Sequence, residues 1–159
     1  MTQEPQEQSK QPVNGLLVRF EDPLLDNLAG EWKINRKMSN RLEENLVKVE
    51  WILNHQFLQI HMKNVTSPPL YEALVFIGYD HEHSKYVVYW LDVFGGRFSE
   101  KGTGTREGNS IKFVFQNQDG LLHNTFTWNA ENHTWRSLIE QTDDQGKWSF
   151  FAEDNYQRA

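Results

Sequence analysis

The sequence predicts an all-β protein in which about ten antiparallel strands follow one another as a meander and close into a barrel. Apolar and polar residues alternate from Trp32 onward, and turn residues interrupt this alternation about every 8 to 12 positions. Aromatic residues, which suit half-buried pleated surfaces, make up 13% of the chain. So many strands in an open twisted sheet would leave long exposed edges, and closure into a barrel removes them.

A short helix is expected before the first strand. Asp22 followed by Pro23 is typical of an N-cap and a first helical residue. Leu24, Leu25 and Leu28 then fall on one helical stripe, which Gly30 terminates. The pattern predicts one or two turns of helix.

The strands are expected where period-two alternation is bounded by turn residues such as Gly95-Gly96 or Asp119-Gly120. The predicted strands span 31–38, 46–54, 56–63, 70–80, 85–94, 97–106, 110–117, 121–129, 134–142 and 147–157. Gly102 and Gly104 indicate a bulge or a close backbone approach in a bent strand.

Two of these strands are apolar on both faces, so a further element must cover their outer side. They contain residues 73–77 and 86–91. One predicted cover is the N-terminal helix with Leu16, Leu17 and Phe20 near it. The alternative cover is a second copy of the chain in a homodimer.

Length and composition define the domain organisation and exclude several partners. Residues 1–14 are polar and predict a disordered tail, and residues 15–159 predict a single domain. The first dozen residues have no apolar region typical of a signal peptide, and no run of about 18 apolar residues occurs, so a cytoplasmic protein is expected. The formal charge of -6 argues against nucleic acid and an anionic membrane as partners.

The sequence predicts no metal and no cofactor. Without cysteine, disulfides, thiolate catalysis and Cys-ligated zinc are excluded. No serine-hydrolase elbow, phosphate-binding loop or zincin motif occurs. His81-Glu82-His83 is the most metal-like cluster, but its position between Asp80 and Ser84 favours a solvated turn.

The motif Gly30-Glu31-Trp32 at the first strand resembles the signature of calycins, which include lipocalins and fatty-acid-binding proteins. In those families the Trp closes the base of the barrel and a late basic residue packs on it. The resemblance implies these structural roles for Trp32 and Arg158, through a cation–π contact.

The resemblance extends to an uncharacterised bacterial calycin-like family, a domain of unknown function, over about residues 20–158. It rests on motifs that include Ile77-Gly78-Tyr79-Asp80, residues 89–96 and 102–106, Asn124-Thr125-Phe126 and Gly146-Lys147-Trp148. The family implies a fold and brings no activity. Haem-binding barrels of the nitrobindin type are similar in outline, but no His follows His133 to serve as their axial ligand.

The candidate site consists of rings and polar side chains that period two places on the inner face of the barrel. The predicted ligand-binding residues are Trp51, Trp90, Asp92, Glu100, Phe115, Asn124, Trp128 and Gln141. A ring-lined interior with a few polar groups is the usual make-up of a small-molecule pocket. The alternatives are a barrel filled with rings, and polar groups that satisfy one another or bind buried water.

These observations favour a protein that binds a small, largely apolar molecule inside the barrel. A first alternative is an isomerase or hydrolase in which Asp92 or Glu100 acts as acid or base, because a carboxylate among rings has a raised pKa. A second alternative is a structural dimerisation module built on the doubly apolar strands.

Overall fold

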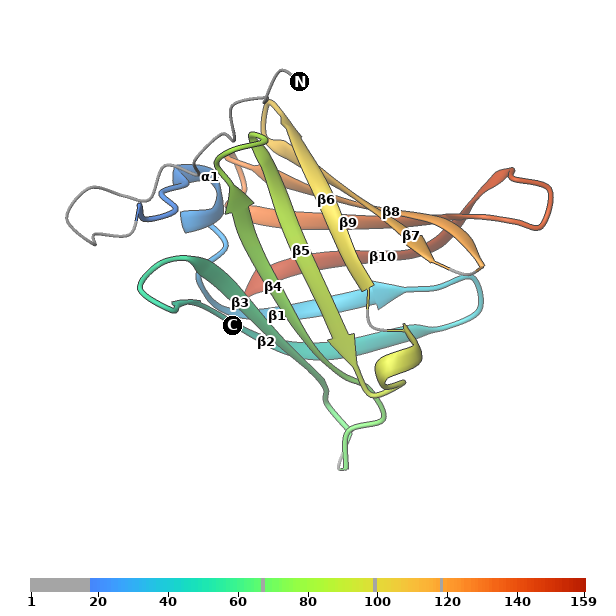
Figure 1. The fold of residues 1–159 in the computed structure, drawn as a ribbon. Helices are drawn as coiled ribbons and strands as arrows, with labels where there is room; N and C mark the ends of the chain where they lie inside the picture. The colour runs from blue at the N-terminus through green and yellow to red at the C-terminus, as the bar shows by residue number, and fades with distance from the viewer. Residues whose placement is uncertain (1–17, 67, 99, 118) are drawn as a thin grey trace, which may run out of the picture.

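A computed structural model describes residues 18–66, 68–98, 100–117 and 119–159, and the predicted tail at 1–14 lies outside them. The side chains of Phe98, Glu100 and Asn117 also lie outside the described part. Ten strands wind in chain order around a closed barrel (Figure 1). They are β1 (Gly30–Lys37), β2 (Leu42–Ile52), β3 (Phe57–Asn64), β4 (Glu72–Asp80), β5 (Lys85–Asp92), β6 (Glu100–Glu107), β7 (Ser110–Asn117), β8 (Gly120–Asn129), β9 (Thr134–Thr142) and β10 (Trp148–Arg158).

Every strand pairs antiparallel with its neighbours in the chain, and β1 pairs with β10 to close the barrel. This is the predicted meander, and only two strand limits differ from the predicted ones by more than two residues. β2 begins four residues before its predicted start, because Leu42 to Asn45 pair with β1 although their polar composition hides the alternation. β6 begins after its predicted start, because Gly96–Phe98 form the 3-10 helix η2.

One end of the barrel is covered by the predicted helix, α1 (Pro23–Asp26) (Figure 1). The side chain of Asp22 accepts a hydrogen bond from the Leu25 N–H at 3.0 Å and caps the helix. Leu24, Leu25 and Leu28 are buried. The indole N–H of Trp32 donates to the Leu28 carbonyl at 2.7 Å, which ties the helix segment to β1. We call this the closed end.

The last strand completes the closed end through Arg158. Its Cζ lies 3.9 Å from the centre of the Trp32 ring. Its two Nη atoms donate to the carbonyls of Ala29 and Asn27 at 2.7 and 3.0 Å. Gly30 has a positive φ of 124°, and a Cβ at this position would meet the Arg158 guanidinium. The first and last strands are therefore joined by one side chain as well as by the sheet.

Rings fill the interior behind α1. Phe20 is buried and packs against the rings of Trp51, Tyr79 and Tyr86 at centroid distances between 5.4 and 6.0 Å. The Tyr86 hydroxyl donates to the second carboxylate oxygen of Asp22 at 2.5 Å. This half of the barrel is a packed core.

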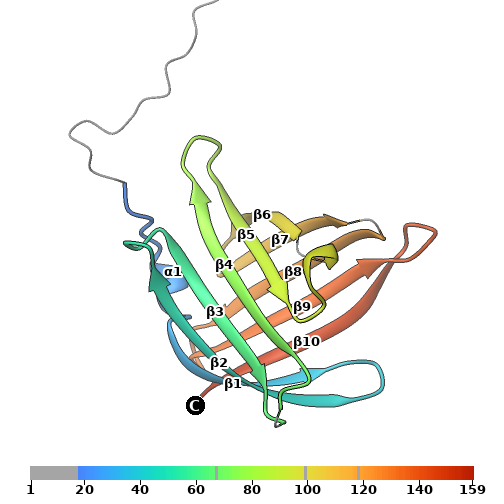
Figure 2. The same cartoon turned by 60° about the horizontal axis from the view of Figure 1, so that its bottom comes forward.

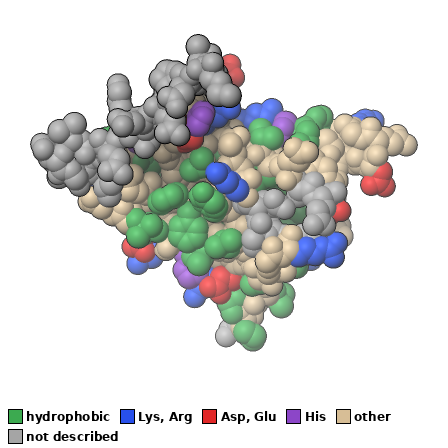
Figure 3. Space-filling view, in the orientation of Figure 1, with side chains coloured by type: hydrophobic (Ala, Val, Ile, Leu, Met, Phe, Trp, Pro, Cys, Tyr) green, Lys and Arg blue, Asp and Glu red, His purple; other side chains and the backbone are tan. Residues whose placement is uncertain are grey.

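The outer face of β4 and β5 is not covered by α1, so the predicted cover is wrong for Phe20 and the helix. Both lie at the closed end, where Phe20, Leu24 and Leu25 are buried and Phe20 packs against interior rings. Leu16 and Leu17 lie outside the described residues. Apolar side chains gather on this face (Figure 3), and Tyr89, Leu91 and Val93 are exposed there. The homodimer stays a prediction.

The prediction of a close approach at the β6 glycines is confirmed. A Cβ on Gly102 would lie 2.9 Å from the Phe115 ring, and one on Gly104 would lie 2.7 Å from the Phe113 ring. The rings of β7 thus lie flat on β6, which only glycine permits.

None of the helices among the described residues combines the length and the apolar character needed to cross a membrane.

Candidate functional site

A cavity with a volume of about 740 Å³ occupies the half of the barrel away from α1. We call this half the open end. It is bordered by the turn at 38–41 and the helix η2, which contribute Met38, Arg41 and Arg97 to the lining, and Figure 2 shows both connections on the side opposite α1. The lining comprises Arg36, Met38, Arg41, Glu43, Leu70, Tyr71, Trp90, Asp92, Phe94, Arg97, Phe115, Asp119, Leu122, Asn124, Ile139 and Phe151.

Most of the lining is apolar. Phe115 and Ile139 are buried in the wall, and Leu122 packs against the core cluster beside them. Leu70 and Phe94 stand at the rim, where they are 77% and 67% exposed. Large exposed apolar side chains at a cavity mouth are typical of a binding site rather than of ordinary surface.

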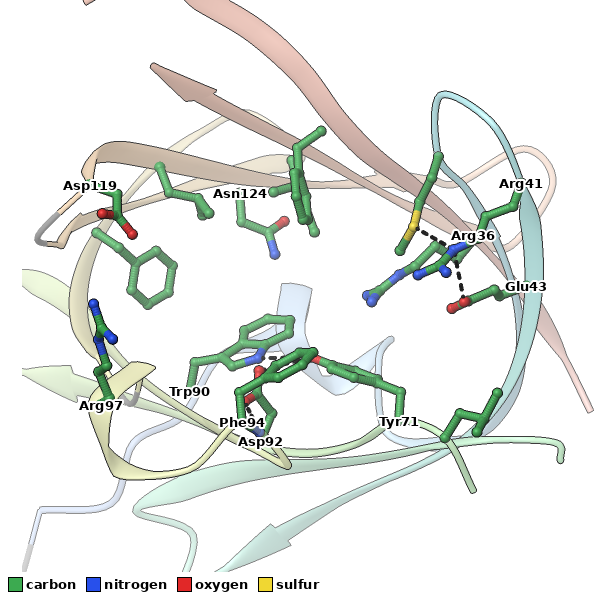
Figure 4. Close-up of a pocket in the computed structure, with 16 residues that line it drawn as sticks. Arg36, Arg41, Glu43, Tyr71, Trp90, Asp92, Phe94, Arg97, Asp119 and Asn124 are labelled. Atoms are coloured by element: carbon green, nitrogen blue, oxygen red, sulfur yellow. Dashed lines mark hydrogen bonds and ion pairs between the residues drawn. The ribbon is translucent and has the colours of Figure 1, made fainter. Parts of the chain in front are cut away.

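A short chain of hydrogen bonds runs along one wall. The indole N–H of Trp90 donates to the Tyr71 hydroxyl at 3.3 Å, and that hydroxyl donates to a carboxylate oxygen of Asp92 at 3.2 Å. The other Asp92 oxygen accepts from the Phe94 N–H at 3.0 Å. Burial raises the pKa of Tyr71 to about 12, so the phenol keeps its proton well into the alkaline range. Figure 4 shows this group on one side of the cavity.

A buried ion pair lies beside the cavity. Arg36 Nε and Nη2 donate to the two carboxylate oxygens of Asp154 at 2.7 and 2.8 Å. The two side chains are only 5% and 1% exposed. Burial alone lowers the pKa of Arg36, but the hydrogen bonds and charge of Asp154 outweigh it and raise that pKa above its ordinary value. Arg36 is therefore a charged group whose charge is already compensated.

Asn124 lies across the cavity from Tyr71 and Trp90 (Figure 4). Its side-chain oxygen accepts a hydrogen bond from the Ser137 hydroxyl at 2.6 Å. The residue is 1% exposed, and its amide nitrogen points into the cavity (Figure 4). One polar atom is thus held by the protein, and the other is directed at the cavity.

The structure brings four of the predicted binding residues together in this cavity: Trp90, Asp92, Phe115 and Asn124. The side chain of Glu100 lies outside the described part of the structure, although its backbone pairs with Trp90. A catalytic use of Asp92 or Glu100 stays a prediction.

The other three predicted binding residues do not line the cavity. Trp51 lies at the closed end, where its indole donates to Asp26 at 2.9 Å and its ring stacks on His55. Trp128 packs there against Trp135. The period-two pattern correctly places both rings on the inner face of the barrel. Both lie in the half that is filled by the packed core, and not in the half that holds the cavity. Gln141 is exposed, and it lies one residue before the end of β9 at Thr142.

Sequence reasoning missed Arg36, Tyr71 and Asp154. Arg36 shares the parity of Trp32 and Ile34 on β1, and Tyr71 precedes the inward Ala73 and Val75 by the same period. Extending the parity to charged and terminal residues would have placed both on the inner face.

The His81-Glu82-His83 segment lies in the exposed turn between β4 and β5. His83 Nδ1 is 2.8 Å from an Asp80 carboxylate oxygen, and the His81 ring packs on Tyr79. Among the described residues, no group of three or more His, Asp or Glu side chains is arranged to hold a metal ion.

A solved structure shares this fold. The crystal structure of Rv2717c from M. tuberculosis aligns with this chain with a TM-score of 0.61 and 12% sequence identity. The alignment covers 87% of this chain and 98% of Rv2717c. At this identity the likeness concerns the fold alone. No curated protein matches the sequence.

A family model covers nearly the whole barrel. The family described as "Protein of unknown function (DUF1579)" matches residues 20–158, from the buried Phe20 to the Arg158 that closes the barrel. The chain therefore belongs to the DUF1579 family of proteins of unknown function.

Proposed function

We propose that this protein binds one small, largely apolar molecule in the cavity at the open end of a calycin-like barrel. The cavity itself carries the proposal. Its volume of about 740 Å³ lies within the range of about 300 to 1,000 Å³ that is usual for small-molecule sites. Its lining joins apolar walls to a few fixed polar groups, which is the common composition of such sites.

The arrangement of the two barrel ends supports this function. The closed end is packed with rings around Phe20, whereas the open end has exposed apolar side chains at its rim. A barrel that served only as a scaffold would gain stability by filling both halves, because an unfilled interior loses dispersion contacts.

Two neighbouring leucines on β8 provide a direct test. Leu122 lines the cavity, whereas Leu121 points outward and is 38% exposed. Leu122→Trp places a large ring in the cavity, and Leu121→Trp adds the same ring outside it. The measurement is the fluorescence of Nile red, a neutral dye that brightens in apolar surroundings, titrated with each full-length variant.

We expect Leu122→Trp to weaken dye binding at least about tenfold and Leu121→Trp to leave it within about twofold of wild type, with both variants folded by circular dichroism. Equal binding by the two variants would place the dye elsewhere and refute the proposal. Native mass spectrometry of freshly purified protein, followed by denaturing extraction, then identifies any molecule that copurifies.

A further inference from the structure

We propose that the ligand of this cavity is an uncharged molecule with a hydrogen-bond acceptor, such as a carbonyl group, at its buried end. This inference rests on the proposed function and concerns the chemical class of the ligand. It follows from two properties of the polar lining, its charge balance and its unused hydrogen-bond donors.

The first property is the charge balance. The lining contains three arginines and three carboxylates: Arg36, Arg41, Arg97, Glu43, Asp92 and Asp119. Arg41 is paired with Glu43 at 3.1 Å, and Arg36 is paired with Asp154 behind the wall. An anionic ligand would lose its hydration here and find no uncompensated positive charge on Arg36 or Arg41.

The second property is the supply of donors. The Tyr71 hydroxyl and the Trp90 indole are engaged with each other and with Asp92. Within the described part of the chain, the Asn124 side chain is hydrogen-bonded through its oxygen, and its Nδ2 makes no hydrogen bond. This side chain is 1% exposed and lines the cavity. Its N–H groups need an acceptor, because a buried donor that stays unpaired costs free energy.

The two properties together select a ligand. N–H donors favour an acceptor oxygen, and the balanced charge favours a neutral one. Trp90, Phe115 and Ile139 then offer an apolar wall to the rest of the molecule. Ketones, esters and amides with a hydrocarbon body meet all three requirements, whereas fatty acids fail the charge requirement.

The test uses two probes of equal carbon number, methyl octyl ketone and decanoate, each competing with Nile red for the full-length protein at pH 7. We expect the ketone to bind at least about tenfold more tightly than decanoate, which must give up the hydration of its charge.

A variant tests the donor. Asn124→Leu keeps the size of the side chain but removes the N–H groups, and we expect about a two- to tenfold loss of ketone affinity. Pentylbenzene, which has no acceptor, should bind this variant as well as it binds wild type. Asn45→Leu is the matched control, because it makes the same substitution at a buried asparagine that is not part of the cavity lining; ketone affinity should stay within about twofold of wild type.

Decanoate binding as tightly as the ketone would overturn the inference while leaving a small-molecule function in place. An unchanged ketone affinity in a folded Asn124→Leu variant would also overturn it. If wild-type protein takes up neither Nile red nor any of the three probes, the proposed function fails and the inference fails with it.

Discussion

The ion pair between Arg36 and Asp154 predicts a large loss of stability when one partner is neutralised. Asp154→Asn leaves the Arg36 guanidinium charged in a site where both side chains are at most 5% exposed. Two unit charges about 4 Å apart attract by about 4 kcal/mol at an effective dielectric constant of about 20. Removing one partner of a buried pair typically costs about 3 to 5 kcal/mol. We therefore expect the free energy of unfolding to fall by about 3 to 5 kcal/mol.

The neighbouring residue supplies the control. Glu153 of β10 pairs with Arg136 of the adjacent strand β9 at 2.9 Å on the outer face of the barrel, where the two side chains are 26% and 52% exposed. Glu153→Gln removes the same kind of charge in contact with solvent, and its expected cost is about 0.2 to 1 kcal/mol. The assay is urea unfolding followed by tryptophan fluorescence, with all variants at the same pH and ionic strength.

A double variant separates charge from packing. Replacing the pair by Arg36→Met and Asp154→Leu removes both charges, so the stability should return to within about 1 kcal/mol of wild type. Equal losses for Asp154→Asn and Glu153→Gln would refute the reasoning. A double variant no more stable than Asp154→Asn would show that shape, and not the unpaired charge, carries the cost.

Three further predictions follow from buried groups elsewhere in the barrel. Burial raises the pKa of three of the five tyrosines, Tyr71, Tyr86 and Tyr156, to about 12 in the case of Tyr71. The protonated phenols therefore contribute fully to the stability of the fold below about pH 10, and this contribution is lost as the pH rises through the raised pKa values. An absorbance titration should therefore show fewer than five tyrosinates while the fold is intact, and five ionising together near pH 10 in folded protein would contradict this. Gly104→Ala drives a Cβ toward the Phe113 ring and should cost about 1 to 3 kcal/mol in urea unfolding, whereas Gly96→Ala, which meets nothing within 4 Å, should cost less than about 1 kcal/mol. In the described part of the structure both polar atoms of the buried Asn45 side chain lack a partner, so Asn45→Leu should raise the thermal midpoint by removing about 1 kcal/mol of unmet hydrogen bonding; a lower midpoint would contradict it.

The fold was predictable because its signals are local. Alternation marks each strand, turn residues mark each reversal, and Asp22-Pro23 marks the start of α1. The antiparallel order then follows from the short connections alone. The local signal failed at the start of β2, where mostly polar residues are held in the strand by their pairing with β1.

The site was predictable in part, because parity tells which face a side chain occupies but not its height in the barrel. Trp51, Trp90 and Trp128 all point inward, yet only Trp90 reaches the cavity. The difference depends on which end α1 fills, and that is a matter of tertiary packing. Arg36 and Asp154 are 118 residues apart, and no local pattern connects two residues at that distance.

The joint between β1 and β10 also constrains how the chain reaches its fold. The strand that starts the barrel meets its second neighbour only when the last strand has formed, and the Arg158 contacts with the helix segment span 129 and 131 residues. Contacts this distant in sequence carry a high loop-closure entropy and slow folding. During synthesis β1 therefore waits with one unpaired edge until β10 leaves the ribosome, and this interval is when the chain is most exposed to misassembly with its own copies.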